Sequence, residues 1–390
     1  MSEKVLIVGG GIAGLASGLA LARARADVQI LERAPAFTEV GAGVQLGPNV
    51  TRILTTWGLL PAIQKVASCP AHLKARSAKS GEVLATLPLL DMPKRYGAPY
   101  VTIHRADLHH VLLQAVQAQG VVLRGNANVQ NLQDLALTES ADAIVIADGV
   151  WSALRQQLLG DGPPRMTGHL AYRALILQAD LPPHLRTQDV SVWMGSKVHV
   201  VQYPVRGGEW LNVVCLTEGQ LQGVNLQDLQ NWNLSKTAEE TRADLQIALK
   251  GSCTHLQALV EACDNWRLWP LCDRLPMQSA AQQAQGRIAL VGDAAHPMRP
   301  YLAQGAGMAM EDAAELAHQW KVLADQDVSQ RFAAFAQVRW QRNARVQARA
   351  IRNGEIFHAT GPMQWARDMG LRTLDERLMD MPWLYGYLRA

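Results

Sequence analysis

The sequence has few cysteines, and they are not spaced to hold a structure together. Five occur in 390 residues, and none belongs to a C-x-x-C pair. An odd number without such pairs argues against a disulfide framework or a structural zinc site. We therefore expect no bound metal, and scattered thiols of this kind suit the reducing cytoplasm. The five are Cys69, Cys215, Cys253, Cys263 and Cys272.

The sequence also lacks a strong excess of charge and a long hydrophobic run. Lysine and arginine number 37 against 34 acidic residues, a formal net charge of +3. Nucleic-acid-binding proteins usually carry a concentrated basic surplus, so we expect no nucleic-acid partner. No apolar run is long enough to cross a bilayer, and Met1–Lys4 leads directly into an expected strand without the pattern of a signal peptide.

What the sequence does contain is enough apolar residues, 48%, to bury the cores of two packed domains. A strand at 4–8, a glycine turn, a helix at 12–24 and a strand at 28–31 follow in the order that builds a parallel sheet. Further expected elements of this kind are a helix at 107–119, strands at 143–146 and 288–291, and a long helix from about residue 306. Residues 172–216 differ, because β-branched and aromatic residues alternate with turn signals and predict antiparallel strands.

The fold class that follows is α/β, with a Rossmann-like nucleotide-binding domain interrupted by a mainly antiparallel substrate domain. We assign residues 1–70, 100–170 and 272–328 to the nucleotide-binding domain, and residues 71–99 and 171–271 to the substrate domain. Residues 329–390 form a C-terminal helical region. Two local signals support helices elsewhere: Pro48 and Gly58 mark the ends of one, and Thr237 with Glu240 predicts a capping box at the start of another.

A G-x-G-x-x-G motif stands between the first strand and the first helix. Gly9 permits the tight turn, Gly11 leaves room for a pyrophosphate, and Gly14 lets the helix pack closely on the strand. The helix N-terminus offers unpaired N–H groups to phosphates, and Glu32 at the end of the second strand is placed to bind an adenosine ribose. Arg25 occupies the helix end where a glycine is common, which predicts a slightly different turn.

Two further acidic motifs follow buried strands. Asp148 to Arg155 reads D-G-x-x-S-x-x-R, and Gly292 to Pro297 reads G-D-A-A-H-P. Each motif places an acidic group at the carboxyl end of a parallel strand, where α/β sheets bind ligands. Either motif alone is more often a turn with a helix-capping aspartate. The three motifs together, in this order and separation, are specific.

The combination resembles the class A flavoprotein aromatic hydroxylases related to para-hydroxybenzoate hydroxylase, from Val5 to about Asp312, less clearly in the inserted domain. The resemblance implies FAD as cofactor, with Asp293 at the FAD ribose and pyrophosphate region. It implies that Asp148 and Arg155 serve both FAD and the passing nicotinamide nucleotide, and that Arg105 of an H-R-x-D-L segment faces the FAD phosphates or ribose. The expected FAD contacts are Gly9, Gly11, Ala13, Gly14, Glu32, Arg33, Arg105, Asp148, Arg155, Asp293, Gly305, Ala306 and Gly307.

The last three of these residues lie in the segment 300–307, which looks like the family's loop beside the isoalloxazine. Many relatives have asparagine or cysteine where Gly307 stands. A particular branch is indicated by the segment 40–49 (VGAGVQLGPN), by Trp193-Met194-Gly195 and by the segment 199–204 (HVVQYP). These are similar to salicylate hydroxylase, 3-hydroxybenzoate 6-hydroxylase and 6-hydroxynicotinate 3-monooxygenase.

The resemblance implies a single-component monooxygenase that uses NAD(P)H and O₂ to hydroxylate a small aromatic acid through a C4a-hydroperoxyflavin. This reaction requires that water be excluded and that a base remove the phenol proton of the substrate. His199 and Tyr203 are the candidate catalytic residues, because they stand four apart in an expected strand and share a face. Without the resemblance, the simpler interpretation is that they decorate one face of a sheet.

Gln45, Arg299 and Tyr301 are the candidate substrate-pocket residues, from their places in the matched loops. Arg299 either holds a substrate carboxylate or forms an ion pair. His296 belongs to a motif, and we expect it to be structural.

The C-terminal region carries arginines at helical spacing, for which a solvated helix face is the default expectation, with docking to a membrane surface or a partner as the alternative. They are Arg339, Arg342, Arg345, Arg349 and Arg352. The aromatic tail 383–387 packs either at a subunit contact or near the pocket, and the chain is a monomer or a homodimer.

Two other functional classes remain open from the sequence. One keeps the FAD fold but acts as an epoxidase or dehydrogenase on a larger apolar substrate. The other is a non-enzymatic flavin redox sensor. Fold analogy alone does not separate them from a hydroxylase.

Overall fold

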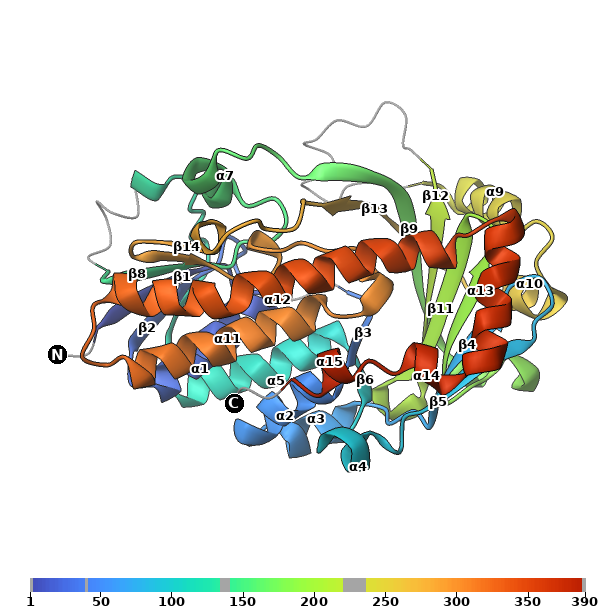
Figure 1. Ribbon diagram of the computed structural model, residues 1–390, viewed down its shortest axis with the longest axis horizontal. Coiled ribbons are helices and arrows are strands. Elements are labelled where there is room, and N and C mark those ends of the chain that lie inside the picture. Colours follow the sequence, from blue (N-terminus) through green and yellow to red (C-terminus); the bar gives the residue numbers. More distant parts are fainter. Residues whose placement is uncertain (1–2, 39–40, 134–140, 220–235, 388–390) are drawn as a thin grey trace.

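The computed structural model describes residues 3–38, 41–133, 141–219 and 236–387 of the chain. Val40, the first residue of the glycine-rich segment singled out above, lies outside these ranges. Two sheets stand at opposite ends of the molecule, and the long helix α12 (Val328–Phe357) runs across the space between them (Figure 1). This division is the expected α/β architecture with an inserted antiparallel sheet.

The first sheet has six strands among the described residues, in the order β14-β15-β8-β1-β2-β7. They are β1 (Lys4–Val8), β2 (Asp27–Leu31), β7 (Val122–Arg124), β8 (Ala143–Ile146), β14 (Ala284–Gln285) and β15 (Ile288–Leu290). All pairs are parallel except β14 with β15. The predicted strands at 4–8 and 143–146 are confirmed to the residue. Both are central strands, and apart from Lys4 at the start of β1 their residues are apolar because helices cover both faces.

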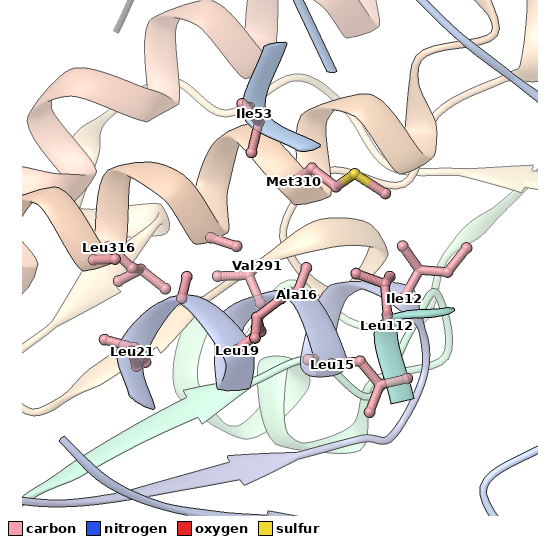
Figure 2. Packing of buried hydrophobic residues seen from close by; sticks show 14 of the residues in the cluster. Ile12, Leu15, Ala16, Leu19, Leu21, Ile53, Leu112, Val291, Met310 and Leu316 are labelled. Atoms are coloured by element: carbon pink, nitrogen blue, oxygen red, sulfur yellow. The ribbon is translucent and has the colours of Figure 1, made fainter. Parts of the chain in front are cut away.

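Helix α1 (Ile12–Arg23) packs against this sheet together with α5 (Arg105–Ala118) and α11 (Gly305–Val322). Figure 2 shows Leu15, Ala16 and Leu19 of α1 between the sheet and α11, which contributes Met310 and Leu316. All five side chains are buried. This packing fixes the start of α1, and therefore the glycine turn, relative to the sheet.

The end of α1 differs from the expectation. Arg25 itself adopts the left-handed conformation, with φ of 68°, that a glycine would take at this position. The turn is therefore of the usual kind, and the difference lies in the backbone strain that a non-glycine residue accepts there.

The second sheet has seven strands among the described residues, in the order β13-β9-β12-β11-β10-β4-β5. They are β4 (His72–Ser77), β5 (Val83–Pro88), β9 (Arg165–Leu177), β10 (Val190–Gly195), β11 (Val198–Val205), β12 (Trp210–Glu218) and β13 (Arg267–Asp273). Only β10 and β4 are parallel neighbours. β9 begins before residue 171, so this strand crosses the domain boundary proposed from the sequence.

Helices α9 (Ala238–Ala248) and α10 (Thr254–Glu261) bury one face of the second sheet. The predicted capping box at the start of α9 is confirmed, since Thr237 and Glu240 each accept a hydrogen bond from the other's backbone N–H. The opposite face of the sheet is turned toward the first domain and forms part of the site described below. Within the described ranges, no helix combines the length and apolar character needed to span a membrane.

Shorter elements connect the two sheets. They are β3 (Gly43–Leu46), α2 (Pro48–Thr56), α3 (Leu60–Val66), α4 (Met92–Tyr96), β6 (Val101–His104), α7 (Ala153–Leu159), α13 (Gly361–Leu374), α14 (Glu376–Met379) and α15 (Pro382–Tyr385). β3 and β6 pair in a two-stranded sheet. The helix predicted between Pro48 and Gly58 is confirmed as α2.

The arginine stripe of α12 is only partly a solvated face: Arg345 and Arg352 are exposed as expected, whereas for Arg339 the expectation was wrong. Arg339 is fully buried and donates to Glu311 and Asp312, at 2.8 Å each. Arg342 donates to Glu311 from two nitrogens, and Arg345 lies 4.1 Å from the ring centre of Trp383. Arg339 and Arg342 face inward because the buried carboxylates of Glu311 and Asp312 require cations there.

Candidate flavin and substrate site

A cavity of about 690 Å³ reaches from the glycine turn of the first domain to the open face of the second sheet. Ten of the thirteen expected FAD contacts line it: Gly9, Gly11, Ala13, Glu32, Arg33, Arg105, Asp148, Asp293, Gly305 and Ala306. The three motifs that lie far apart in the sequence are therefore brought to one wall. Gly14, Arg155 and Gly307 are outside the lining.

The glycine turn has the close contacts that the motif predicts. Gly9 has φ of +111°, and a Cβ at Gly14 would collide with the carbonyl oxygen of Gly9. Gly11 precedes the first residue of α1, and Ile12 and Ala13 line the cavity beside it. The first N–H groups of α1 have no partner within the helix, so this end of the cavity is suited to a phosphate.

Glu32 fastens the turn to the second strand. Its carboxylate accepts from the backbone N–H of Gly10 at 2.6 Å and of Ala34 at 2.9 Å, and it lines the cavity. On the other side, Nε2 of buried His109 contacts the carbonyl oxygen of Gly10 at 2.8 Å. Sequence reasoning left His109 without a role, because a histidine within a helix carries no motif.

Asp148 provides a buried polar group in the lining of the cavity. Its Oδ1 atom is buried and has no hydrogen-bond partner among the described residues. Burial raises the pKa of this carboxyl group to about 6. A buried acceptor facing a cavity costs free energy unless a ligand donates to it, and the hydroxyl groups of a dinucleotide are such donors. The residues present at this wall fit FAD.

Arg155 serves the site indirectly, contrary to the expected direct contact. It is buried, donates from Nε to Asp161 at 2.8 Å and also donates to the carbonyl oxygen of Ala294 at 2.9 Å. With these partners the guanidinium of Arg155 joins α7 to the loop 292–296, and Arg155 is not among the residues that line the cavity. Gly307 packs toward Val50 and Gln304, and Gly14 toward Gly9.

The other end of the cavity lies against the second sheet and is mainly apolar. Its lining includes Val201 and Tyr203 of β11, Val214 and Leu216 of β12, and, from the first domain, Gln45, Met298, Pro300 and Gln304. The Tyr203 hydroxyl donates to the carbonyl oxygen of Gly43 at 2.6 Å, and that of Tyr100 donates to Oε1 of Gln45 at 2.6 Å. The first bond joins the second sheet to β3, and the second holds the side chain of Gln45 at the edge of the pocket.

Arg173 of β9 also lines the apolar end, and sequence reasoning missed it. Its guanidinium lies 4.9 Å from the ring centre of Trp269. No carboxylate among the described residues pairs with it, and its buried Nε has no hydrogen-bond partner there. The usable signal in the sequence was a single arginine within an otherwise apolar strand segment, AYRALIL.

Arg299 and Tyr301, proposed for the pocket, are not among the lining residues. Arg299 donates from Nε to Asp273 at 2.9 Å, which is the ion pair that the sequence left open as its alternative. The Tyr301 hydroxyl bonds to Nδ1 of His169 at 2.7 Å. His199 shares the cavity-facing side of β11 with Tyr203, as expected, but is 1% exposed and lies beyond the lining, against Tyr301.

Comparison with known proteins agrees with this geometry. The family model described as "FAD binding domain" matches residues 2–350. A 3-hydroxybenzoate 6-hydroxylase of Polaromonas naphthalenivorans (strain CJ2) is 35% identical, over 98% of this chain and 96% of that protein. A 6-hydroxynicotinate 3-monooxygenase of Pseudomonas fluorescens is 34% identical, over 89% of this chain and 90% of that protein.

Among solved structures, Klebsiella pneumoniae HpxO complexed with FAD and uric acid superposes with a TM-score of 0.82. It is 22% identical, over 97% of this chain and 94% of that chain, and shows the shared fold. The chain belongs to the FAD-binding domain family, and FAD is its cofactor. Its close similarity to hydroxylases of this family covers nearly the whole sequence.

Proposed function

We propose that the protein is a single-component FAD-dependent monooxygenase that uses NAD(P)H and O₂ to hydroxylate a small aromatic acid. The observation that carries this proposal is the set of residues that line the cavity. The end lined by the expected FAD contacts continues into an apolar pocket, and this pocket contains Arg173, which has no acidic partner among the described residues. The names of the relatives, which act on hydroxybenzoate and hydroxynicotinate, support an acidic aromatic substrate.

The pocket residues provide binding and orientation. Arg173 pairs with the substrate carboxylate, since a guanidinium donates two parallel hydrogen bonds to such a group. Val201, Val214 and Leu216 contact the ring, and Met298 closes the apolar wall from the first domain. Gln45, held by Tyr100, offers its amide to a ring substituent. These contacts fix the ring beside the segment that contains Gly305 and Ala306.

When bound, FAD supplies hydride acceptance from NAD(P)H and activation of O₂. The chain contributes a pocket from which water is excluded and a group that takes the phenol proton. For that group we propose His199, which lies behind the cavity lining on the same face of β11 as the lining residue Tyr203, so that the substrate proton crosses the lining to reach it. Burial raises the pKa of the Tyr203 hydroxyl, so Tyr203 stays protonated and orients the substrate, while the neutral imidazole accepts the proton.

The test is NAD(P)H-dependent oxygen uptake by the purified yellow protein, with and without catalase, against hydroxybenzoates and hydroxypyridine carboxylates. We expect one compound to stimulate uptake, to be converted to a hydroxylated product, and to release almost no peroxide. If no compound stimulates uptake, or if catalase returns much of the oxygen for all of them, the aromatic-acid proposal is wrong. A larger apolar substrate or a redox-sensing role would then replace it.

A further inference from the structure

A chain of hydrogen bonds connects buried His199 to the surface. Nδ1 of His199 lies 2.7 Å from Nε2 of His358, the residue that ends α12. Nδ1 of His358 lies 3.3 Å from Oε1 of Glu218, at the end of β12. The side chain of His358 is 3% exposed and that of Glu218 is 39% exposed. The chain therefore runs from the closed interior to a carboxylate in contact with solvent.

The backbone holds the outer two members of this chain in place. The N–H of Lys197 donates to the carbonyl oxygen of His358, and the N–H of Glu218 donates to the carbonyl oxygen of Lys197, both at 3.2 Å. Lys197 belongs to the tight turn between β10 and β11 and has φ of +61°. One turn thus fixes the end of α12 against the end of β12, and places His358 over the strand that carries His199.

The order of donors and acceptors along the chain follows from the carboxylate. An ionised Glu218 only accepts, so Nδ1 of His358 carries the hydrogen. In a neutral ring the other nitrogen, Nε2, then has no hydrogen and accepts from Nδ1–H of His199. The remaining nitrogen of His199, Nε2, is left as a bare acceptor. We propose that Glu218, acting through His358, sets the tautomer of His199 so that Nε2 is the basic nitrogen, and that both are positioning residues for it.

This role rests on the proposed hydroxylase function, and its proton balance is complete. The proton that the substrate hydroxyl loses crosses the cavity lining to Nε2 of His199, and Nδ1–H of His199 passes to Nε2 of His358. Nδ1–H of His358 passes to Glu218, which exchanges it with water. The O–H bond of the substrate is the bond that breaks, no electrons are transferred, and each imidazole is neutral at the end but in the opposite tautomer. The return of a proton along the same chain to the product oxygen restores the starting tautomers.

The surroundings favour neutral imidazoles. Burial lowers the pKa of His199 well below its ordinary value, and nearby His358 and His169 lower it further. Burial lowers the pKa of His358 to about 4, with Arg299 and Arg367 adding to the effect. Tyr301, Phe357 and His169 are the other side chains with rings close to His199 or His358. Because His199 does not retain a second proton, it has to release one, and the hydrogen bonds through His358 to Glu218 provide the route.

The direct test is ¹⁵N NMR of the histidine side chains in the FAD-loaded protein without substrate. The His199 signals are assigned by their loss in H199Q. We expect a protonated Nδ1 and an unprotonated Nε2 in the natural protein, and the reverse in E218K, because an ammonium only donates. The matched control E239K makes the same charge change on exposed α9 and is expected to leave His199 unchanged. The opposite tautomer in the natural protein, or no change in E218K, would overturn the proposal.

Activity provides the second readout. E218K is expected to lower kcat for hydroxylation by about 100-fold, the scale of a lost general base, with little change in KM for the aromatic acid. H358F keeps a ring beside His169 but removes both nitrogens, and it should lose kcat similarly. Full kcat in folded, FAD-loaded H358F would contradict the proposal. If the natural protein hydroxylates no aromatic acid, the proposed function fails, whereas the NMR result still decides the tautomer.

Discussion

The guanidinium of Arg173 lies above the ring of Trp269, with 4.9 Å between its central carbon and the ring centre. Such stacking holds a cation in place without neutralising it. Arg173 is therefore oriented by an aromatic side chain and keeps its hydrogen-bond donors for a ligand in the cavity. Burial lowers its pKa, as does nearby Arg105, yet a guanidinium remains protonated in proteins. An anionic substrate would relieve the cost of burying this charge.

Replacing Arg173 tests the carboxylate contact. R173Q should raise KM for the aromatic acid by about 10- to 100-fold, since a hydrogen bond to a charged group contributes about 1.5–3 kcal/mol. Steady-state kinetics with the acid and with its carboxamide measure the effect, which should nearly vanish for the carboxamide. The control is R165Q, which removes an arginine bound to Asp273 outside the cavity lining. An equal KM increase for the acid and the carboxamide would contradict the assignment.

The glycine turn makes a steric prediction. G14A should abolish FAD retention or folding, because the added Cβ collides with the carbonyl oxygen of Gly9. The flavin absorbance per mole of purified protein and the thermal midpoint report the loss. G370A is the matched helical control, since a Cβ there would find its nearest neighbour at 3.7 Å. That variant should be neutral or slightly stabilising, by up to about 1 kcal/mol. Normal FAD content in G14A would exclude the close-packing role.

Asp148 predicts a pH dependence of the apoprotein. Its pKa is raised in the folded state from 3.8 to about 6, mainly by burial. A raised pKa means that the folded state binds the proton more tightly, so stability falls as the pH rises through this window. D148N removes the free-energy cost of ionising this buried carboxyl group. It should therefore stabilise the apoprotein at pH 8 by up to about 3 kcal/mol, with little effect at pH 4. Urea unfolding of both proteins at the two pH values measures this, and an equal difference at both would contradict it.

Arg339 makes a prediction about stability alone. R339L leaves the buried carboxylates of Glu311 and Asp312 without their shared cation. Removing one partner of a buried ion pair costs about 3–5 kcal/mol, and chemical denaturation measures it. The exposed pair of Arg372 with Glu82 is the comparison, and R372Q should cost no more than about 1 kcal/mol. A similar decrease in the free energy of unfolding for R339L and R372Q would contradict the larger contribution expected of the buried network.

His199 is tested by its effect on coupling. H199A should still permit NAD(P)H oxidation, because no expected FAD contact is altered. The substrate would keep its phenol proton, so the oxygen consumed should appear mainly as hydrogen peroxide. Product yield per NAD(P)H, with peroxide determined by catalase, is the measurement. An unchanged yield would remove His199 from the mechanism.

The first domain was predictable because its signals are local. Strand, glycine turn and helix follow one another within residues 4–31, and each glycine acts on atoms a few residues away. The acidic motifs at Asp148 and Asp293 reach the same cavity because the carboxyl ends of parallel strands meet at one edge. Fold class and most FAD contacts therefore follow from short segments.

The substrate end was less predictable because its contacts join distant residues. Arg173 becomes a candidate for binding a carboxylate only once the described structure shows no acid beside it, whereas Arg299 has Asp273. His358 and Glu218 are 140 positions apart and belong to no motif. The α12 arginines have the spacing of a solvated face, and only the buried carboxylates of α11 reveal that Arg339 and Arg342 point inward.

The C-terminal tail packs behind the segment that leads from β3 into α2. Arg52 of α2 donates to the carbonyl oxygens of Tyr385 and Tyr387, both at 2.7 Å, and the ring of Tyr385 packs against Gly47. Gly47 follows β3, which carries Gln45 at the cavity, so the tail supports the pocket from outside. Proteolytic removal of residues 383–387 would therefore leave the nucleotide motifs in place but withdraw this support from the segment that carries Gln45.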